Sequence, residues 1–290
     1  LPSYVASTEE FNTGVVGGSW ATGGSLNTAR ESLGGTGVST AALAFGGGST
    51  GVNVTELYNG TNWTEVNNLT TARANIQGNG TQTATLAFGG YTGSQTAVTE
   101  LWNGTNWTEV NDLNTARYSP GGAGTSTAGL AFGGAAPVKN ETELWNGTNW
   151  TEVNNLGTAR YGAAGAGTST AALAFGGTAD PPNTALTETW NGTNWTEVND
   201  LNTARYGLGG AGTQTAALAF GGNPRTNVTE TWNGTNWTEV GDLGTARDGL
   251  AGAKSGTNTA TLAFGGATPA ASAATEEWNA GAQVKTIDTD

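Results

Sequence analysis

Side chains that could act as acids, bases or nucleophiles are few in this sequence. Its 290 residues include no His and no Cys, which removes the commonest general base, the thiolate nucleophile and thiolate metal ligands. Pairs of carboxylates could cleave glycosidic bonds. Nearly all Glu residues, however, recur at the same position of an internal repeat, whereas the residues of a single active site would occur in one repeat and not in the others. Glu31, Asp180 and Asp248 come nearest to doing so. We therefore expect no enzyme activity, no cofactor and no metal site, with a secreted enzyme acting on glycans as the alternative.

The charge balance narrows the choice of partner. The chain carries 10 basic and 23 acidic residues, a formal net charge of −13. A phosphate backbone or an anionic membrane requires a cationic surface, so we expect no nucleic acid as partner. Nor do we expect membrane insertion, because no run approaches the about 18 apolar residues of a spanning helix.

Three motifs recur along the chain and define its organisation. Asn-Gly-Thr-Asn-Trp-Thr-Glu-Val occurs five times with a period of 42 to 45 residues, measured between Trp63, Trp107, Trp150, Trp195 and Trp237. Leu-Ala-Phe-Gly-Gly occurs six times, with Phe45, Phe88, Phe132, Phe175, Phe220 and Phe264. Thr-Ala-Arg ends at Arg30, Arg73, Arg117, Arg160, Arg205 and Arg247. A period in the low forties with short apolar segments predicts the blades of a β-propeller.

Each repeat contains four short segments with strand character. After Arg205 these are a glycine-rich segment at 206–212, then 215–222, 229–233 and 237–243. The Asn-Gly between the last two predicts a tight hairpin. Glycine in the first segment suits the innermost strand, where side chains would clash. The order of Gly-Gly, a third-strand aromatic, Trp in Thr-Asn-Trp and an opening Arg resembles the kelch repeat over residues 8–288.

The resemblance implies an all-β, six-bladed propeller of kelch-like four-stranded blades, a single domain over residues 1–290 whose blades begin near the six Arg residues of Thr-Ala-Arg. The copper oxidase activity known among kelch propellers needs His and a Cys–Tyr crosslink, so it is not implied here. The near-identical repeats also resemble those in structural proteins of bacteriophages.

Closure of the ring is predicted from the mismatched ends of the chain. There are six inner strand pairs but seven candidate outer pairs. Residues 1–29 contribute a closing strand, in which Trp20 to Leu26 form the outermost strand of the blade begun by Arg247. Residues 1–15 or 279–290 would then be surplus and could pair with a neighbour. The chain begins at Leu1 without a signal-peptide pattern, so we expect a processed or partial chain.

The Trp, Arg and Asn residues that recur in every repeat are predicted to have structural roles. The Trp of each repeat is predicted to fill one inter-blade slot rather than to stack on a sugar. The Arg of each Thr-Ala-Arg is predicted to pair with the Glu of Trp-Thr-Glu: Glu65, Glu109, Glu152, Glu197 and Glu239. The Asn-x-Thr sequons, such as those at Asn59 and Asn62, are explained by the hairpin turn rather than by glycans.

Positions where the repeats differ carry the functional prediction. The loop after each Gly-Gly varies, and so does the residue after each Arg, whereas the Gly-Thr and Asn-Gly-Thr-Asn turns barely change. In an antiparallel blade both variable sets lie on one face, and binding residues concentrate on loops held by a rigid scaffold. The predicted ligand-binding residues are Tyr91, Tyr118, Tyr161, Tyr206, Lys139, Asp180 and Arg225. Neutral drift of loops without packing constraint is the competing explanation.

These observations predict a non-enzymatic recognition or structural propeller that works outside the cell or on a virion surface, as a fibre or appendage component. Its partners would be a host-surface glycan or protein, or other subunits of the virion or appendage. Assembly through surplus terminal strands, including formation of a homo-oligomer, is a further alternative.

Overall fold

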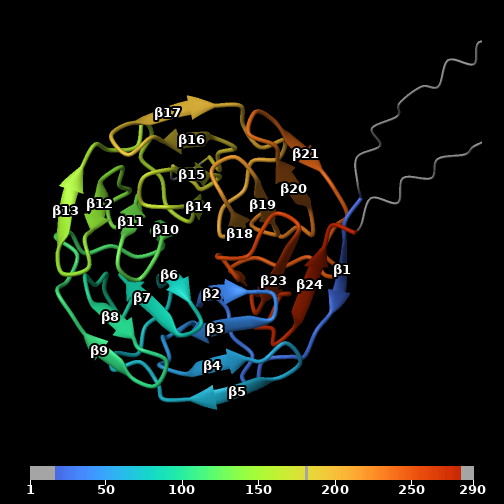
Figure 1. Cartoon of the computed structure of the whole chain (residues 1–290), viewed down its shortest axis with the longest axis horizontal. Coiled ribbons are helices and arrows are strands. Elements are labelled where there is room, and N and C mark those ends of the chain that lie inside the picture. The colour runs from blue at the N-terminus through green and yellow to red at the C-terminus, as the bar shows by residue number, and fades with distance from the viewer. Residues whose placement is uncertain (1–16, 180–181, 282–290) are drawn as a thin grey trace, which may run out of the picture.

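A computed structural model describes residues 17–179 and 182–281 of the chain. In these residues the structure has 24 β-strands and no helix, and the strands form six four-stranded antiparallel sheets. The sheets are arranged as blades around a central axis, each with its first strand innermost (Figure 1). The prediction of a six-bladed propeller with four strands per blade is confirmed.

The blades follow the chain in order. Blades 1 and 2 consist of β2 (Gly34–Val38), β3 (Ala41–Phe45), β4 (Thr55–Tyr58), β5 (Trp63–Val66), β6 (Gln77–Thr81), β7 (Ala84–Phe88), β8 (Thr99–Trp102) and β9 (Trp107–Glu109). Blades 3 and 4 consist of β10 (Gly121–Gly124), β11 (Gly129–Phe132), β12 (Thr142–Trp145), β13 (Trp150–Val153), β14 (Ala164–Gly167), β15 (Ala172–Phe175), β16 (Thr187–Trp190) and β17 (Trp195–Val198). Blades 5 and 6 consist of β18 (Gly209–Gly212), β19 (Ala217–Phe220), β20 (Thr229–Trp232), β21 (Trp237–Glu239), β22 (Ala251–Gly252), β23 (Ala260–Phe264), β24 (Thr275–Asn279) and β1 (Ser19–Thr22).

The two ends of the chain share blade 6. Strand β1 pairs antiparallel with β24, with Trp20 opposite Trp278, and Figure 1 shows the blue first strand beside the red last one. Closure by strand exchange is therefore confirmed, although the strand ends at Thr22 rather than extending to Leu26. Of the segments predicted to be surplus, Asn279 belongs to β24 and pairs with Ser19; residues 1–15 and 282–290 lie outside the described residues.

Each inner strand carries a glycine against which the preceding blade packs its Phe. A Cβ on Gly78 would lie 2.5 Å from the Phe45 ring, and one on Gly210 would lie 2.7 Å from the Phe175 ring. Such separations are shorter than any ordinary van der Waals contact, so only glycine fits. Inner strands also crowd one another, since a Cβ on Gly165 would lie 2.4 Å from the Gly122 carbonyl oxygen and one on Gly252 2.8 Å from that of Gly210. The predicted need for glycine in the innermost strand is therefore confirmed, and the Phe of the preceding blade adds to the crowding.

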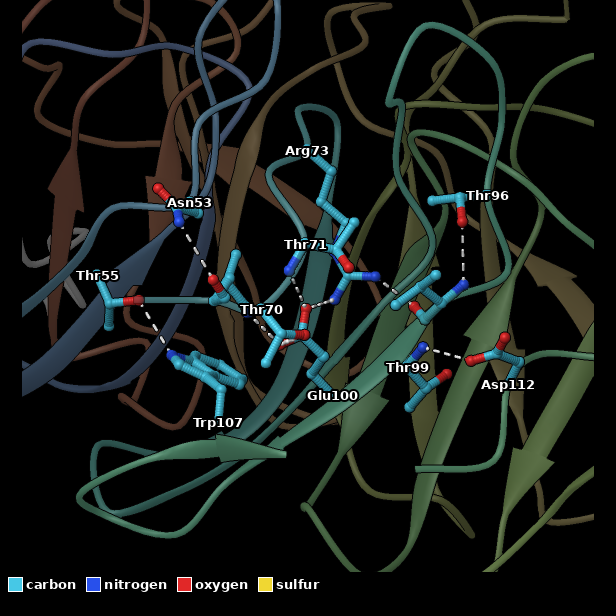
Figure 2. Close-up of polar contacts among 12 residues, drawn as sticks. Asn53, Thr55, Thr70, Thr71, Arg73, Thr96, Thr99, Glu100, Trp107 and Asp112 are labelled. Carbon is cyan, nitrogen blue, oxygen red and sulfur yellow. Dashed lines mark hydrogen bonds and ion pairs between the residues drawn. The ribbon is translucent and has the colours of Figure 1, made fainter. Parts of the chain in front are cut away.

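The outer-strand Trp residues fill equivalent slots between blades. In blade 2 the Trp107 indole N–H donates to Thr55 Oγ1 of blade 1 at 3.0 Å, and its ring centroid lies 5.2 Å from that of Phe45 (Figure 2). Trp20 makes the same contacts with blade 5, at 3.0 Å to Thr229 Oγ1 and 5.0 Å to the Phe220 ring. The structural interpretation of the repeated Trp is confirmed, and the closing strand uses the same slot.

The Asn-Gly loops differ from the predicted two-residue hairpin. Tyr58 and Trp63 are opposite each other and flank a four-residue loop, in which Gly60 alone has a positive φ, of 93°. The Asn59 side chain stabilises the loop instead of a second residue with positive φ. Its Oδ1 accepts the N–H groups of Thr61 and Asn62 at 3.0 and 2.8 Å. This bonding confirms that the Asn residue of the sequon serves the turn.

Candidate functional site

The six arginines of Thr-Ala-Arg belong to the scaffold and not to an anion site. Arg73 is fully buried, and its Nη2 donates to Glu100 Oε1 at 3.1 Å (Figure 2). The same carboxylate accepts the Thr70 N–H at 2.7 Å. Burial lowers the pKa of Arg73 to about 10, against the opposing charge of Glu100. Each buried guanidinium is thus neutralised inside its own blade.

The predicted partner of these arginines is wrong by one strand. Arg73 pairs with Glu100 on β8 and not with Glu109 on β9, and the other five arginines likewise pair with third-strand acids: Glu56, Glu143, Glu188, Glu230 and Glu276. Glu100 and Glu109 are opposite each other across the two strands. The outer one is exposed, so the buried cation pairs with the inner one.

The two variable sets meet on one face of the propeller. In blades 2 to 6 the residue after the Arg forms a bridge with a residue just after Gly-Gly in the same blade, as in Tyr118–Ala135, Tyr161–Thr178 and Tyr206–Asn223. In blade 2 the positions are exchanged: Ala74 follows Arg73, and Tyr91 from the loop lies opposite it. A tyrosine therefore occupies this rim in four consecutive blades.

Those four side chains form a continuous row, which we call the tyrosine arc: Tyr91, Tyr118, Tyr161 and Tyr206. Successive ring centroids lie 5.8, 6.3 and 6.0 Å apart at interplanar angles of 76°, 62° and 65°. These are favourable edge-to-face contacts, so each ring restricts the rotamers of the next. All four are half-buried, which leaves part of each ring accessible.

Charged groups extend the row into blade 6. Asp248 occupies the position of the tyrosines, and its Oδ1 lies 2.9 Å from Arg225 Nε. Arg225 Nε also donates to the Ala267 carbonyl at 3.1 Å, and Asn223 Nδ2 to the second Asp248 oxygen at 3.2 Å. Arg225 is thus an ordered, exposed cation at the end of the tyrosine arc.

The other predicted site residues lie elsewhere or are not described. Lys139 is only 8% exposed, so it contributes little to this surface. Asp180 lies outside the described residues. The structure therefore brings together the four tyrosines on one rim, with Arg225 beyond them, and places Lys139 inside the fold.

A ring of backbone hydrogen bonds, not foreseen from the sequence, supports the tyrosine arc from the axis side. The second residue after each Arg donates its N–H to the equivalent carbonyl of the preceding blade at 2.7–2.9 Å, closing a cycle through Ser32, Asn75, Ser119, Gly162, Gly207 and Gly249. All six have φ between 49° and 64°, the left-handed region that Ser, Asn and Gly tolerate best. We call this cycle the backbone belt.

The backbone belt fixes the spacing of the residues beside it, because each tyrosine after an Arg precedes a belt residue directly. A Cβ on Gly162 would lie 3.2 Å from Tyr206 Cδ2, so the ring packs against the belt itself. Beneath the belt lies a cavity of about 90 Å³, lined by belt residues and by apolar side chains such as Ile76 and Leu208. The tyrosine arc thus lies on a rim, braced by the backbone belt, around this cavity.

Neither a metal site nor a membrane span is found in the part of the chain that the structure describes. Across residues 17–179 and 182–281 no group of three or more acidic side chains could hold a metal ion. Over the same residues no helix is long and apolar enough to cross a membrane.

The fold and this face define the protein as a six-bladed β-propeller with a rigid aromatic rim on one face. Neither the protein-family models nor the curated proteins include a match to this chain. The kelch and bacteriophage resemblances therefore rest on the repeat motifs alone.

Proposed function

We propose that the protein is a non-enzymatic recognition propeller of the kelch type that binds a glycan along its tyrosine arc. The observation that carries the proposal is the row of four edge-to-face tyrosines from four consecutive blades. Tyrosine offers a large amphipathic surface at a low cost in side-chain entropy, and the backbone belt has already fixed the spacing. A row of near-equal intervals suits a ligand that is itself a repeating chain.

A glycan suits the arc better than a protein partner for a reason of charge. The arc itself carries no formal charge, and the one cation at its end is neutralised by Asp248. Alternating ring edges and faces present phenol groups and apolar surface together, and these fit the hydroxyls and C–H faces of sugars. By its repeats, which resemble those of bacteriophage structural proteins, we place the protein outside the cell, on a virion fibre or appendage, with a host-surface glycan as ligand.

The alternative of a glycan-cleaving enzyme has less support. Of the three acids that could serve it, Asp248 is engaged by Arg225 at 2.9 Å, and Asp180 lies outside the described residues. Glycosidases use two carboxylates that flank one bond. Glu31 and Asp248 follow the Arg of neighbouring blades, but the Asp248 carboxylate is already paired with Arg225.

The test is a triple substitution of the arc. Tyr118→Ala, Tyr161→Ala and Tyr206→Ala together should weaken binding to bacterial surface polysaccharides, presented on a glycan array, by at least about tenfold, because a buried aromatic anchor contributes more than about 1 kcal/mol. The matched control replaces the same three residues with Phe, which keeps the ring contacts. Circular dichroism and melting temperature verify that both variants fold.

Two results would overturn the proposal. One is unchanged glycan binding by the folded triple-Ala variant. The other is binding to host cells that survives enzymatic removal of their surface glycans, which would identify the ligand as a protein.

A further inference from the structure

The first hairpin of blade 6 breaks the repeat on the face opposite the tyrosine arc. Fifteen positions separate the Arg of Thr-Ala-Arg from the Phe of Leu-Ala-Phe in five repeats, whereas seventeen separate Arg247 from Phe264. The two added residues fall at Lys254 and Ser255, between β22 and β23. The expectation that the Gly-Thr turns barely change is therefore wrong for this blade.

The added residues cross the central channel. Lys254 Nζ lies 3.4 Å from the Gly122 carbonyl oxygen of blade 3, which is opposite blade 6 in the ring. Ser255 Oγ donates to the Gly80 carbonyl of blade 2 at 2.6 Å. The serine thus anchors the insertion, and the lysine places a single ammonium group near the axis.

This ammonium group lines a cavity of about 190 Å³. The walls are the inner hairpins of blades 3, 4 and 5, built of glycine, alanine and threonine, and Lys254 is the sole ionisable residue among those that line it. No ion pair to Lys254 is present among the described residues. Burial lowers the pKa of Lys254 to about 7, since nothing in the cavity compensates the charge.

We propose that this cavity binds a small organic monocarboxylate, with Lys254 as its anchor. A buried charge is costly unless it is paired, and a carboxylate supplies both the missing charge and acceptors for the ammonium N–H groups. The cavity offers one positive charge, so a singly charged anion neutralises it, whereas a phosphate dianion would leave one negative charge unpaired. The threonine hydroxyls at the hairpin turns mark the entrance from solvent.

Acetate is the probe, and the lysine side chains report its binding. The chain contains three lysines, so protein with ¹³C-labelled lysine gives three Cε signals, and Lys254→Met identifies one of them. Sodium acetate added at pH 6 should shift the Lys254 signal saturably and leave the other two in place. Because the bound state requires the protonated amine, whose pKa is about 7 in the free protein, binding should be about tenfold weaker at pH 8 than at pH 6.

The controls separate a site from a general salt effect. Sodium chloride at equal ionic strength should give no saturable shift, and Lys139→Met should leave acetate binding unchanged. The proposal is overturned if acetate moves all three signals alike, if chloride has the same effect as acetate, or if the affinity is the same at pH 6 and pH 8. These three outcomes are read from the titration of the wild-type protein, and Lys254→Met serves to assign its signal.

Discussion

Replacement of Trp20 by Ala tests ring closure, because this side chain holds the N-terminal strand in the last blade. The indole bonds Thr229 of blade 5 at 3.0 Å and lies 5.0 Å from the Phe220 ring and 5.3 Å from the Trp278 ring. The equivalent Trp107 makes matching contacts in blade 2 but belongs to a strand that follows its neighbour in sequence. Trp107→Ala is therefore the matched control.

The size of the effect follows from burial. A buried Trp replaced by Ala costs about 3–5 kcal/mol of unfolding free energy. Trp107 is 6% exposed and belongs at the upper part of that range, whereas Trp20 is half-buried and belongs near about 3 kcal/mol. In a chain of this size about 1 kcal/mol corresponds to about 2 °C in melting temperature, so we expect a decrease of about 6 °C for Trp20→Ala.

The two variants should differ in where amide protection is lost. β1 pairs on one side only, with β24, through the four residues from Ser19 to Thr22, so Trp20→Ala should release this strand locally. Hydrogen exchange should then accelerate in β1 and along β24, while Trp107→Ala leaves β1 protected below the melting transition. If Trp20→Ala changes neither the melting temperature nor exchange in β24, the inference that this strand closes the ring is refuted.

Three further predictions concern charged and titrating groups. Glu100→Gln should destabilise the fold by about 3–5 kcal/mol because it leaves a buried guanidinium unpaired, whereas Glu109→Gln should change urea unfolding by under about 0.5 kcal/mol; equal effects would contradict the revised assignment of the pair. Burial and the hydrogen bond to Glu277 raise the pKa of Tyr58 to about 12, above the unfolded value of about 10. The protonated phenol therefore stabilises the fold fully below pH 10, and this stability is lost as the pH rises through 12. The melting temperature, measured between pH 9 and 12, should fall with pH less steeply in Tyr58→Phe than in the wild type. The lowered pKa of Lys254, about 7, means that unfolding takes up a proton between pH 7 and about 10.4, so Lys254→Met should stabilise most below pH 7 and progressively less up to pH 10; a gain that is constant with pH would be inconsistent with burial of the amine.

Repetition made the architecture predictable and also set the limit of prediction. The blade count, the Trp slots and the closing strand follow from spacing, because a position repeated in every blade must serve one local purpose. The partner of Arg73 could not be chosen this way, since Glu100 and Glu109 are repeated equally often and face each other across two strands. The choice depends on which carboxylate is buried, a property of the assembled sheet.

The candidate sites show the same division. Variable positions predict the tyrosine arc, yet Lys139 is equally variable and is buried. Variation in a loop does not tell whether a side chain points to solvent or into the fold. The sequence carries a signal for the backbone belt, namely Ser, Asn or Gly at the second position after every Arg. The insertion at Lys254 and Ser255 was visible as a change in one spacing, but its path across the channel depends on all six blades.

Residues at the interfaces of blade 6 differ from their equivalents in the other blades, and these differences mark where the closing strand belongs. Near-identical blades offer near-identical slots, so an outer strand could dock in the wrong blade or in another molecule. The interface between blades 6 and 1 is marked by Tyr58, whose hydroxyl donates to Glu277 at 2.6 Å; the corresponding residue in blades 2 to 5 is Trp.

Glycines mark both sides of the closing strand. A Cβ on Gly24 would lie 2.0 Å from the Thr61 carbonyl oxygen, and one on Gly241 would lie 2.1 Å from that of Gly18, whereas the equivalent Asn67 bonds the next blade through its side chain. The closing segment therefore meets Gly241 of blade 5 on one flank and presents its own Gly24 to blade 1 on the other. The equivalent position in blades 1 to 4 is Asn. These contacts distinguish the correct closure from its near-identical competitors, which explains why symmetry is broken at the seam even where no ligand binds.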